Sequence, residues 1–490
     1  MIRNIFKPLK KIALLSCLFY FSSCMLLQST LSAKDGYNVA VQFEDVQNEK
    51  IYLCHYFGKG STVYKDDSLT LDAAGKGTFR SSEAIVGGVY LILFEDRSAT
   101  LEFILLNGNS FSLFSKKADV RNTKFKGNSE NKQYYQYQEF LNSFGGEYEK
   151  IMNSYSTAKS REDSAVIDLA AKTKVKDLTN YRNKFAERNP KLFMSKMFKA
   201  IGEPQIPKEL PILPDGSKDS SFPAEYYKAH YWDDYDFRDD RLIYTPIYEG
   251  KLKNYMDRWV LPIADSVKDA SDMILKKSMG SPETFKYSLW YLSRWTEQSK
   301  IMGMDEAFVH LVENYYMRGL ATWIDSAQLA KYVERAKKIA PNMIGQQAID
   351  IRMPEMKTGT IIPLSTVEAE YTLLIFWSPD CGHCKKEIPR VDSIVRNELK
   401  NIDIKIYGVN AENEYEKQWE KLVDDLNFKE NWIHVHDPKH QSPFRNFYDV
   451  YSTPTIYLLD KDKKIVGKKL DHKNLKGLVD YLEKKKKEKN

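Results

Sequence analysis

The sequence predicts a multi-domain protein, with an N-terminal β-sandwich-like domain, a central α-helical domain and a C-terminal α/β domain. Its 490 residues suffice for two to four domains. The composition, 42% hydrophobic and 29% charged, is that of a globular protein and not of a disordered chain. The apolar pattern changes near residues 129 and 344, from short alternating runs to helical spacing, and then to buried strands that alternate with helices. We therefore expect domains at residues 34–128, 129–343 and 344–490.

Residues 1–33 have the pattern of an export signal. A basic start, MIRNIFKPLKK, precedes an apolar run and then small residues. The run Ile12–Leu27 is short against the roughly 20 apolar residues that a membrane span needs. We favour cleavage near Ala33 and release of a soluble protein; the alternative is lipidation of Cys24 in FSSC, which would anchor the chain. Both routes predict the periplasm or the cell envelope.

The net charge gives no case for nucleic acid binding. The first 33 residues carry four positive charges and no acid, so a chain that starts at Lys34 has a net charge of +2 instead of +6. A nearly neutral chain lacks the basic surface that attracts phosphates.

Five cysteines are too few for a disulfide-stapled scaffold. Cys17 and Cys24 belong to the export signal. Cys54 lies in KIYLCHYF, an alternating strand-like run, and is expected to be a small buried hydrophobic residue. Cys381 and Cys384 are therefore the cysteines that we consider as candidates for a chemical role.

Residues 34–128 contain short β-rich runs that Gly, Asn, Asp and Lys separate at close intervals. This pattern predicts a small antiparallel sandwich. From residue 129 the spacing is helical; in MDEAFVHLVENYY it places Phe308, Leu311, Val312 and Tyr315 on one helix face.

The segment His230–Val260 is rich in aromatic residues and aspartates. We expect core aromatics with solvated acids between them; the alternative is a carbohydrate- or peptide-binding surface. The acids lack the spacing and the glycine of a calcium loop.

Residues 344–490 predict a mixed sheet that is covered on both faces. Tyr371–Trp377 is a continuous apolar run, typical of a strand buried on both sides, and CGHCKKEIPRVDSIVRNELK follows as a helix. Further strands and helices alternate until an antiparallel hairpin and a last helix close the domain.

The motif Cys381-Gly382-His383-Cys384 allows three interpretations. Haem attachment requires His directly after the second cysteine, where this chain has Lys385. A structural zinc site requires four ligands. His434 and His436 could in principle complete one, but they share a face of one short strand and lack finger-like spacing. We therefore favour a redox dithiol and expect no metal and no cofactor.

The position of Cys381 favours a thiolate. It falls where a strand ends and a helix begins, so that free N–H groups and the helix dipole stabilise negative charge. His383 and Lys385 add donors or positive charge nearby. Cys384 lies one turn into the helix, where it can attack a mixed disulfide on Cys381.

The stretches LLIFWSPDCGHCKKEIP and STPTIYLLDKDKK resemble the thioredoxin superfamily. They are most similar to exported thiol-disulfide oxidoreductases of periplasmic reduction and cytochrome c maturation. The resemblance covers about residues 344–490 and implies a thioredoxin fold.

The resemblance also implies roles for individual residues. Pro454 is expected in the cis form facing the dithiol, with Thr453 presenting backbone groups to an extended substrate. Trp377 is assigned to substrate binding with these two. Glu387 would accept the proton of the buried thiol. One departure is Ile375, six positions before Cys381, where relatives carry Asp, Glu or Asn.

We expect an exported thiol-disulfide oxidoreductase that reduces or isomerises disulfides of envelope proteins and receives electrons from a membrane-bound donor. Gly-His between the cysteines is the dipeptide of disulfide isomerases, so the redox direction stays open. The alternative is a non-catalytic thioredoxin-like binding module. A peroxidase would require a Pro-x-x-x-Thr-x-x-Cys pattern, which the motif lacks.

Overall fold

The computed structural model describes residues 35–412, 416–426, 428, 431–437, 441–442 and 444–489. The predicted export signal and Cys24 lie outside these ranges. The chain divides into two compact units: the first holds the described residues up to Pro204 together with Trp232–Gly250, and the second holds Gln205–Tyr231 and the chain from Lys251. The predicted boundaries at residues 128 and 343 each fall inside one unit and remain predictions. No helix in the described ranges is both long and apolar enough to cross a membrane.

The N-terminal region is a sandwich of two four-stranded sheets with the orders β4-β1-β7-β8 and β3-β2-β5-β6. Alternate residues of β1, among them Val39, Val41 and Phe43, enter one core between the sheets. Cys54 is fully buried, as predicted. The strands are β1 (Tyr37–Phe43), β2 (Lys50–Phe57), β3 (Lys59–Thr70), β4 (Lys76–Ser81), β5 (Gly88–Phe94), β6 (Thr100–Leu105), β7 (Asn109–Ser115) and β8 (Lys124–Lys126).

The predicted antiparallel arrangement is wrong for one pair of strands. β1 pairs with β7 in parallel, with Val39 opposite Phe111. A parallel pair needs a long connection between its strands. Here the whole second sheet lies in sequence between β1 and β7, and it provides that connection.

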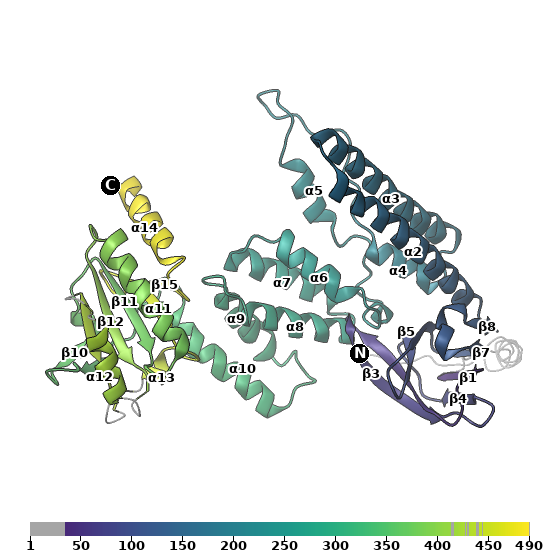
Figure 1. The fold of residues 1–490 in the computed structure, drawn as a ribbon, viewed down its shortest axis with the longest axis horizontal. Coiled ribbons are helices and arrows are strands. Elements are labelled where there is room, and N and C mark those ends of the chain that lie inside the picture. Colours follow the sequence, from purple (N-terminus) through teal and green to yellow (C-terminus); the bar gives the residue numbers. More distant parts are fainter. Residues whose placement is uncertain are drawn as a thin grey trace, which may run out of the picture. The chain divides into compact units, whose positions relative to one another are not determined.

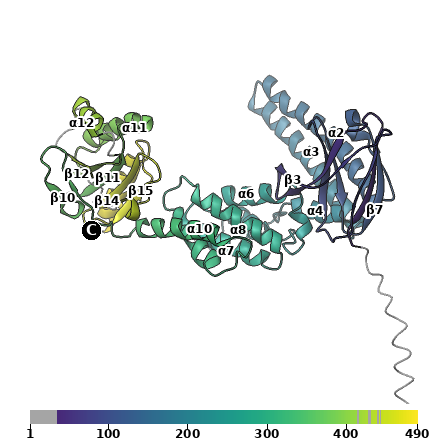
Figure 2. The same cartoon turned by 90° about the horizontal axis from the view of Figure 1, so that it is seen from below.

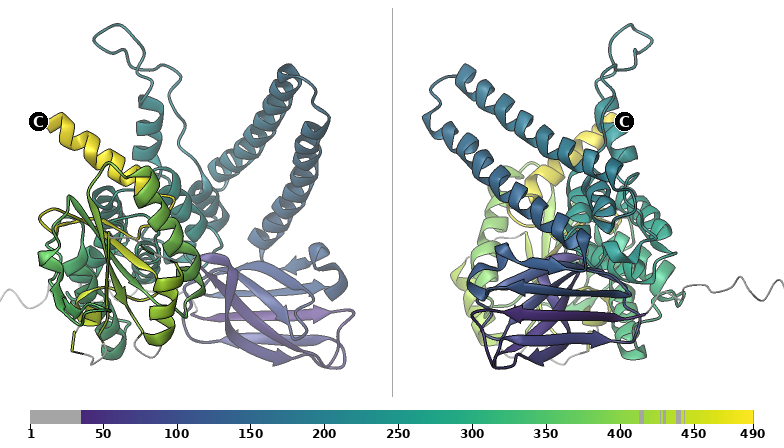
Figure 3. Two further views of the ribbon diagram at one scale, coloured as in Figure 1. Left: turned by 60° about the vertical axis from the view of Figure 1, so that its left-hand side comes forward. Right: turned by 90° about the vertical axis from the view of Figure 1, so that its right-hand side faces the viewer.

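Three helices complete most of the first unit: α2 (Ser129–Asn153), α3 (Arg161–Arg188) and α4 (Phe193–Ile201). The side chain of Ser160 caps α3 by accepting a hydrogen bond from the backbone N–H of Asp163. The carboxylate of Asp163 in turn accepts from the backbone N–H of Ser160. Figure 3 shows α2 and α3 as a helical hairpin, and Tyr181 of α3 stacks on Phe140 of α2 with ring centroids 4.3 Å apart.

The aromatic and aspartate-rich segment contributes core residues to the first unit, as predicted. Trp232, Tyr235 and Tyr248 are buried, and the rings of Tyr235 and Tyr248 lie 5.2 Å apart. Asp239 differs from the expected solvated acid, because its side chain is only 8% exposed and pairs with Lys196 at 2.7 Å and with Arg241 at 2.6 Å.

The second unit contains the remaining helices of the central region. The predicted apolar face is confirmed, since Phe308, Leu311, Val312 and Tyr315 are all buried. Its elements are α5 (Phe222–His230), most of α6 (Tyr248–Arg258), α7 (Ala264–Ser278), α8 (Pro282–Glu297), α9 (Asp305–Leu311), η4 (Val312–Tyr316), α10 (Ser326–Ile339) and η5 (Ala340–Asn342). The short helix η3 (Asp240–Leu242) and the first residues of α6 belong to the first unit.

The C-terminal domain has a mixed five-stranded sheet with the order β13-β12-β11-β14-β15 (Figure 1). β11, β12 and β13 are parallel, whereas β14 and β15 run antiparallel to their neighbours, which confirms the predicted mixed sheet. The strands are β11 (Tyr371–Trp377), β12 (Ile404–Asn410), β13 (Trp432–Val435), β14 (Thr455–Asp460) and β15 (Ile465–Lys468), and a separate hairpin joins β9 (Arg352–Pro354) to β10 (Ile361–Pro363).

Both faces of this sheet are covered, because β11 alternates its side chains between two cores. Leu373 and Ile375 face one core with α11, α12 and α14, while Leu374 and Phe376 face the other, with α13 and the hairpin. Figure 2 shows α11 and α12 on one side of the strands. The helices are α11 (Gly382–Ser393), α12 (Glu416–Asp425), α13 (Phe444–Phe447) and α14 (Leu475–Lys489).

Candidate active site

Cys381 is the N-cap residue of α11, directly after the end of β11. Its backbone is extended, and its sulfur accepts a hydrogen bond from the N–H of Cys384 at 3.3 Å. An N-cap acceptor satisfies one of the unpaired N–H groups of the first helical turn. The sulfur is thus held at the positive end of the helix dipole, as the sequence predicted.

The surroundings of Cys381 lower its pKa below the ordinary value of 9.0. Partial burial raises the pKa, but hydrogen bonds from the side chains of Thr453 and Cys384 and from the N–H groups of Cys384 and His383 outweigh it. Hydrogen bonds to a charged group favour its charged form. Cys381 is therefore the more easily ionised thiol of the pair.

Cys384 has the opposite environment. Its side chain is fully buried among the residues that α11 packs against the sheet. Burial, strengthened by the nearby Cys381, raises the pKa of Cys384 to about 12. A buried thiol with a high pKa beside a half-exposed thiol with a low pKa separates a nucleophile from a resolving group.

Thr453 and Pro454 lie against the dithiol. β14 begins at Thr455, and the register of β14 places Thr455 opposite Phe376 near the end of β11. The peptide bond before Pro454 is cis, and the thiol of Cys381 donates to the carbonyl of Thr453 at 3.2 Å. The structure therefore brings together two residues that lie 72 positions apart, as the resemblance implied.

The side chains of His383 and Lys385 are exposed. Of His383, the backbone N–H is the group that contributes to the lowered pKa of Cys381. Solvent and salt screen exposed charges strongly. The predicted contribution of these two side-chain charges to thiolate stability remains a prediction.

Glu387 lies one helical turn beyond Cys384, and its carboxylate is held by His472. It accepts from the backbone N–H of His472 at 2.5 Å and contacts the ring Nδ1 at 2.8 Å. Sequence reasoning missed His472, because 85 positions separate it from Glu387 and no local motif marks it. Proton transfer by Glu387 remains a prediction.

Trp377 does not fit its predicted part in substrate binding. Its side chain is fully buried and packs edge-on against Trp419 with ring centroids 6.4 Å apart. Trp377 is the last residue of β11, and its side chain lies on the same face of the strand as Leu373 and Ile375, in the core with α11. Ile375, the departure noted in the sequence, lies in the same core and is fully buried.

The two histidines weighed for zinc lie among aromatic rings. His434 stacks on Trp432 with centroids 5.0 Å apart, and burial lowers the pKa of His434 to about 4. His436 stacks on Trp419. Within the residues that the structure describes, no group of three or more His, Cys, Asp or Glu is arranged to hold a metal ion.

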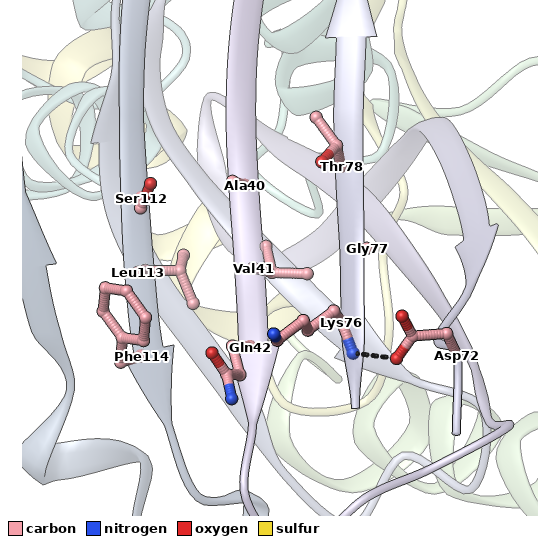
Figure 4. A pocket seen from close by; sticks show the side chains of 10 residues that line it. All are labelled: Ala40, Val41, Gln42, Asp72, Lys76, Gly77, Thr78, Ser112, Leu113 and Phe114. Carbon is pink, nitrogen blue, oxygen red and sulfur yellow. Dashed lines mark hydrogen bonds between the residues drawn. The ribbon is translucent and has the colours of Figure 1, made fainter. Parts of the chain in front are cut away.

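A pocket of about 310 Å³ lies on the sandwich, over β1, β4 and β7 (Figure 4). Gln42, Lys76, Ser112 and the half-exposed Phe114 are among its lining residues. The carboxylate of Asp72 is occupied by the N–H of Lys76 at 2.8 Å. The residues that line the pocket all belong to the sandwich, in the first compact unit, whereas the dithiol belongs to the second.

The AhpC/TSA family matches residues 344–468, which include both cysteines, Glu387, Thr453 and Pro454 but not His472. Together with the sheet order and the Cys381–Thr453 contact, this match decides the family. The C-terminal domain belongs to the thioredoxin superfamily. A domain family of unknown function, DUF5106, matches residues 163–342. No curated protein matches the chain.

Solved structures resemble this thioredoxin-like domain or a larger part of the chain. A domain of a possible thiol-disulfide isomerase from Cytophaga hutchinsonii is 32% identical, covers 30% of this chain and 96% of its own, and has a TM-score of 0.26. The thioredoxin domain of a thiol-disulfide oxidoreductase from Bacteroides vulgatus is 26% identical, with coverages of 28% and 96% and a TM-score of 0.25. A thioredoxin-like protein from Bacteroides caccae is 22% identical, with coverages of 56% and 99% and a TM-score of 0.45.

Proposed function

We propose that the protein is a thiol-disulfide oxidoreductase that reduces or isomerises disulfides of other proteins through Cys381 and Cys384. The observation that carries this proposal is the contrast between the two thiols, one half-exposed with a lowered pKa and one buried with a pKa raised to about 12. Only a thiolate attacks a disulfide, so this contrast assigns the order of attack.

In the first step, the Cys381 thiolate attacks one sulfur of the substrate disulfide. A bond forms between Cys381 Sγ and that sulfur while the substrate S–S bond breaks. The second substrate sulfur leaves as a thiolate and takes a proton from water. The carbonyl of Thr453, which the reduced Cys381 contacts, lies where an extended substrate chain would pair with it.

In the second step, Cys384 loses its proton and attacks Cys381 Sγ. The Cys381–Cys384 disulfide forms, and the first substrate sulfur leaves as a thiolate. The substrate has gained two electrons, which the dithiol has lost and an external dithiol donor must return. Glu387 is the proposed proton acceptor for Cys384, since it lies one turn further along α11 and His472 holds its carboxylate in place.

The pattern of residues 1–33 supports export, so the proposed substrates are proteins of the periplasm or cell envelope and the proposed donor is membrane-bound. Whether the chain acts mainly as a reductase or an isomerase depends on its potential. Disulfide isomerase and thioredoxin have potentials of about −180 and −270 mV, a difference of roughly 4 kcal/mol.

Insulin reduction by the full chain tests the proposal. With dithiothreitol as the electron donor, the wild-type chain should speed the precipitation of reduced insulin, and Cys381→Ser should not. Equal rates for the two proteins would overturn the proposal and favour a binding module. Faster consumption of hydrogen peroxide than of insulin would favour a peroxidase.

A further inference from the structure

The segment that precedes Thr453 is held by a helix of the central region. Arg335 of α10 forms an ion pair with Asp449, and both side chains are largely buried. The Nε atom of Arg335 also lies 3.3 Å from the carboxylate of Glu297. α10 belongs to the same compact unit as the dithiol, but it lies outside the residues that the AhpC/TSA family matches.

Arg335 also contacts Tyr451, two positions before Thr453. The guanidinium carbon lies 4.4 Å from the centre of the tyrosine ring, a cation–π geometry. Tyr451 as a residue is 77% exposed, although its partner Arg335 is largely buried. One face of the ring is therefore held by Arg335, while the rest of its surface stays available to another molecule.

Buried polar contacts fasten this part of the unit further. Asn342 donates from its side chain to the carbonyl of Phe447 at 2.6 Å. Lys468 of β15 pairs with Asp305 of α9 at 2.6 Å, and both side chains are buried. Buried polar groups of this kind need their partners, so they hold α9 and η5, which directly follows α10, against the thioredoxin-like domain.

The position of Tyr451 suits a substrate contact. Consecutive residues advance by at most about 3.6 Å, so the Cα atom of Tyr451 lies within about 7 Å of that of Thr453. Thr453 itself touches the sulfur of Cys381. A chain bonded to Cys381 and paired with Thr453 thus passes within reach of the exposed ring.

We propose that Tyr451, fixed by Arg335, is a specificity-determining contact for the substrate polypeptide. It binds an apolar or aromatic side chain one to three residues from the substrate cysteine. Arg335 is a positioning residue that holds the ring. This inference rests on the proposed oxidoreductase function and gives the central helices a part in choosing substrates.

Two cysteine peptides test the inference, each joined by a mixed disulfide to a chromogenic thiol. One carries Phe and the other Gly at the three positions on each side of the cysteine. The full wild-type chain should reduce the Phe peptide with a kcat/KM about threefold to tenfold above that for the Gly peptide, a difference typical of one aromatic contact and carried by KM. Tyr451→Ala and Arg335→Ala should lose this preference, whereas Tyr451→Phe should keep it.

Tyr481→Ala is the matched control, because Tyr481 is also an exposed tyrosine of this domain with a lysine near its ring. It should keep the preference. Hydroxyethyl disulfide, which has no side chain to reach Tyr451, should react equally with all variants. An unchanged preference in Tyr451→Ala, or no preference in the wild type, would overturn the inference. Failure of the wild type to reduce any of these disulfides would instead overturn the proposed oxidoreductase function.

Discussion

Alkylation of the reduced full chain with limiting iodoacetamide at pH 7 should modify Cys381 and spare Cys384. The reason is the state of the two thiols. With a pKa of about 12, roughly one Cys384 side chain in 10⁵ is ionised at pH 7, against roughly one in 100 for a thiol at the ordinary value of 9.0. Burial thus suppresses the reactive form about 1000-fold, which corresponds to roughly 4 kcal/mol. The full burial of Cys384 also keeps the reagent away.

Cys381 should respond in the opposite direction. Its pKa lies below 9.0, so its alkylation rate should rise with pH and reach half of its maximum below pH 9.0. Peptide mapping by mass spectrometry after timed quenching measures both sites in one sample. Cys54, which is buried with a pKa raised to about 11, is an internal control for an unreactive thiol. Equal labelling of Cys381 and Cys384, or a Cys381 midpoint above pH 9.0, would refute the assigned order of attack.

Three further predictions concern single side chains. Cys381→Ala removes the helix cap and should lower the free energy of unfolding by about 1 kcal/mol, whereas Cys381→Ser keeps a cap; equal chemical denaturation curves would contradict this. Glu387→Gln should slow release of substrate from the mixed disulfide by about 100-fold and leave Cys381 alkylation unchanged; an unchanged release rate would show that Glu387 only anchors the loop at His472. Lys468→Met leaves the Asp305 carboxylate buried without its cation and should lower the free energy of unfolding by about 3–5 kcal/mol. The double variant Lys468→Met with Asp305→Leu should restore most of this stability. A melting temperature of Lys468→Met equal to that of the wild type would contradict a buried pair.

Local patterns predicted the elements that carry the dithiol. A continuous apolar run such as Tyr371–Trp377 has few alternatives to a buried strand, and the helix after it follows from the spacing of its apolar residues. The placement of Cys381 at a helix start is a property of neighbouring residues. These features depend on residues that are close together in the sequence, so local patterns were enough to predict them.

Features that depend on residues far apart in the sequence could not be predicted from local patterns. The parallel pairing of β1 with β7 is set by how the second sheet folds between them. The bond between Glu387 and His472 joins positions on two separate elements. Whether Trp377 faces substrate or core depends on how closely α11 and α12, which lie elsewhere in the sequence, pack over the end of β11, and the aromatic side chain is compatible with both.

Trapping of the reaction intermediate tests the central claim most directly. The full chain with Cys384→Ser, incubated with native insulin whose disulfides are intact, should accumulate a mixed disulfide through Cys381. Mass spectrometry should show it as a mass increase that dithiothreitol removes. The same chain with Cys381→Ser added should form none. A Cys384→Ser chain that forms no adduct, or one whose adduct maps to Cys54, would contradict the account.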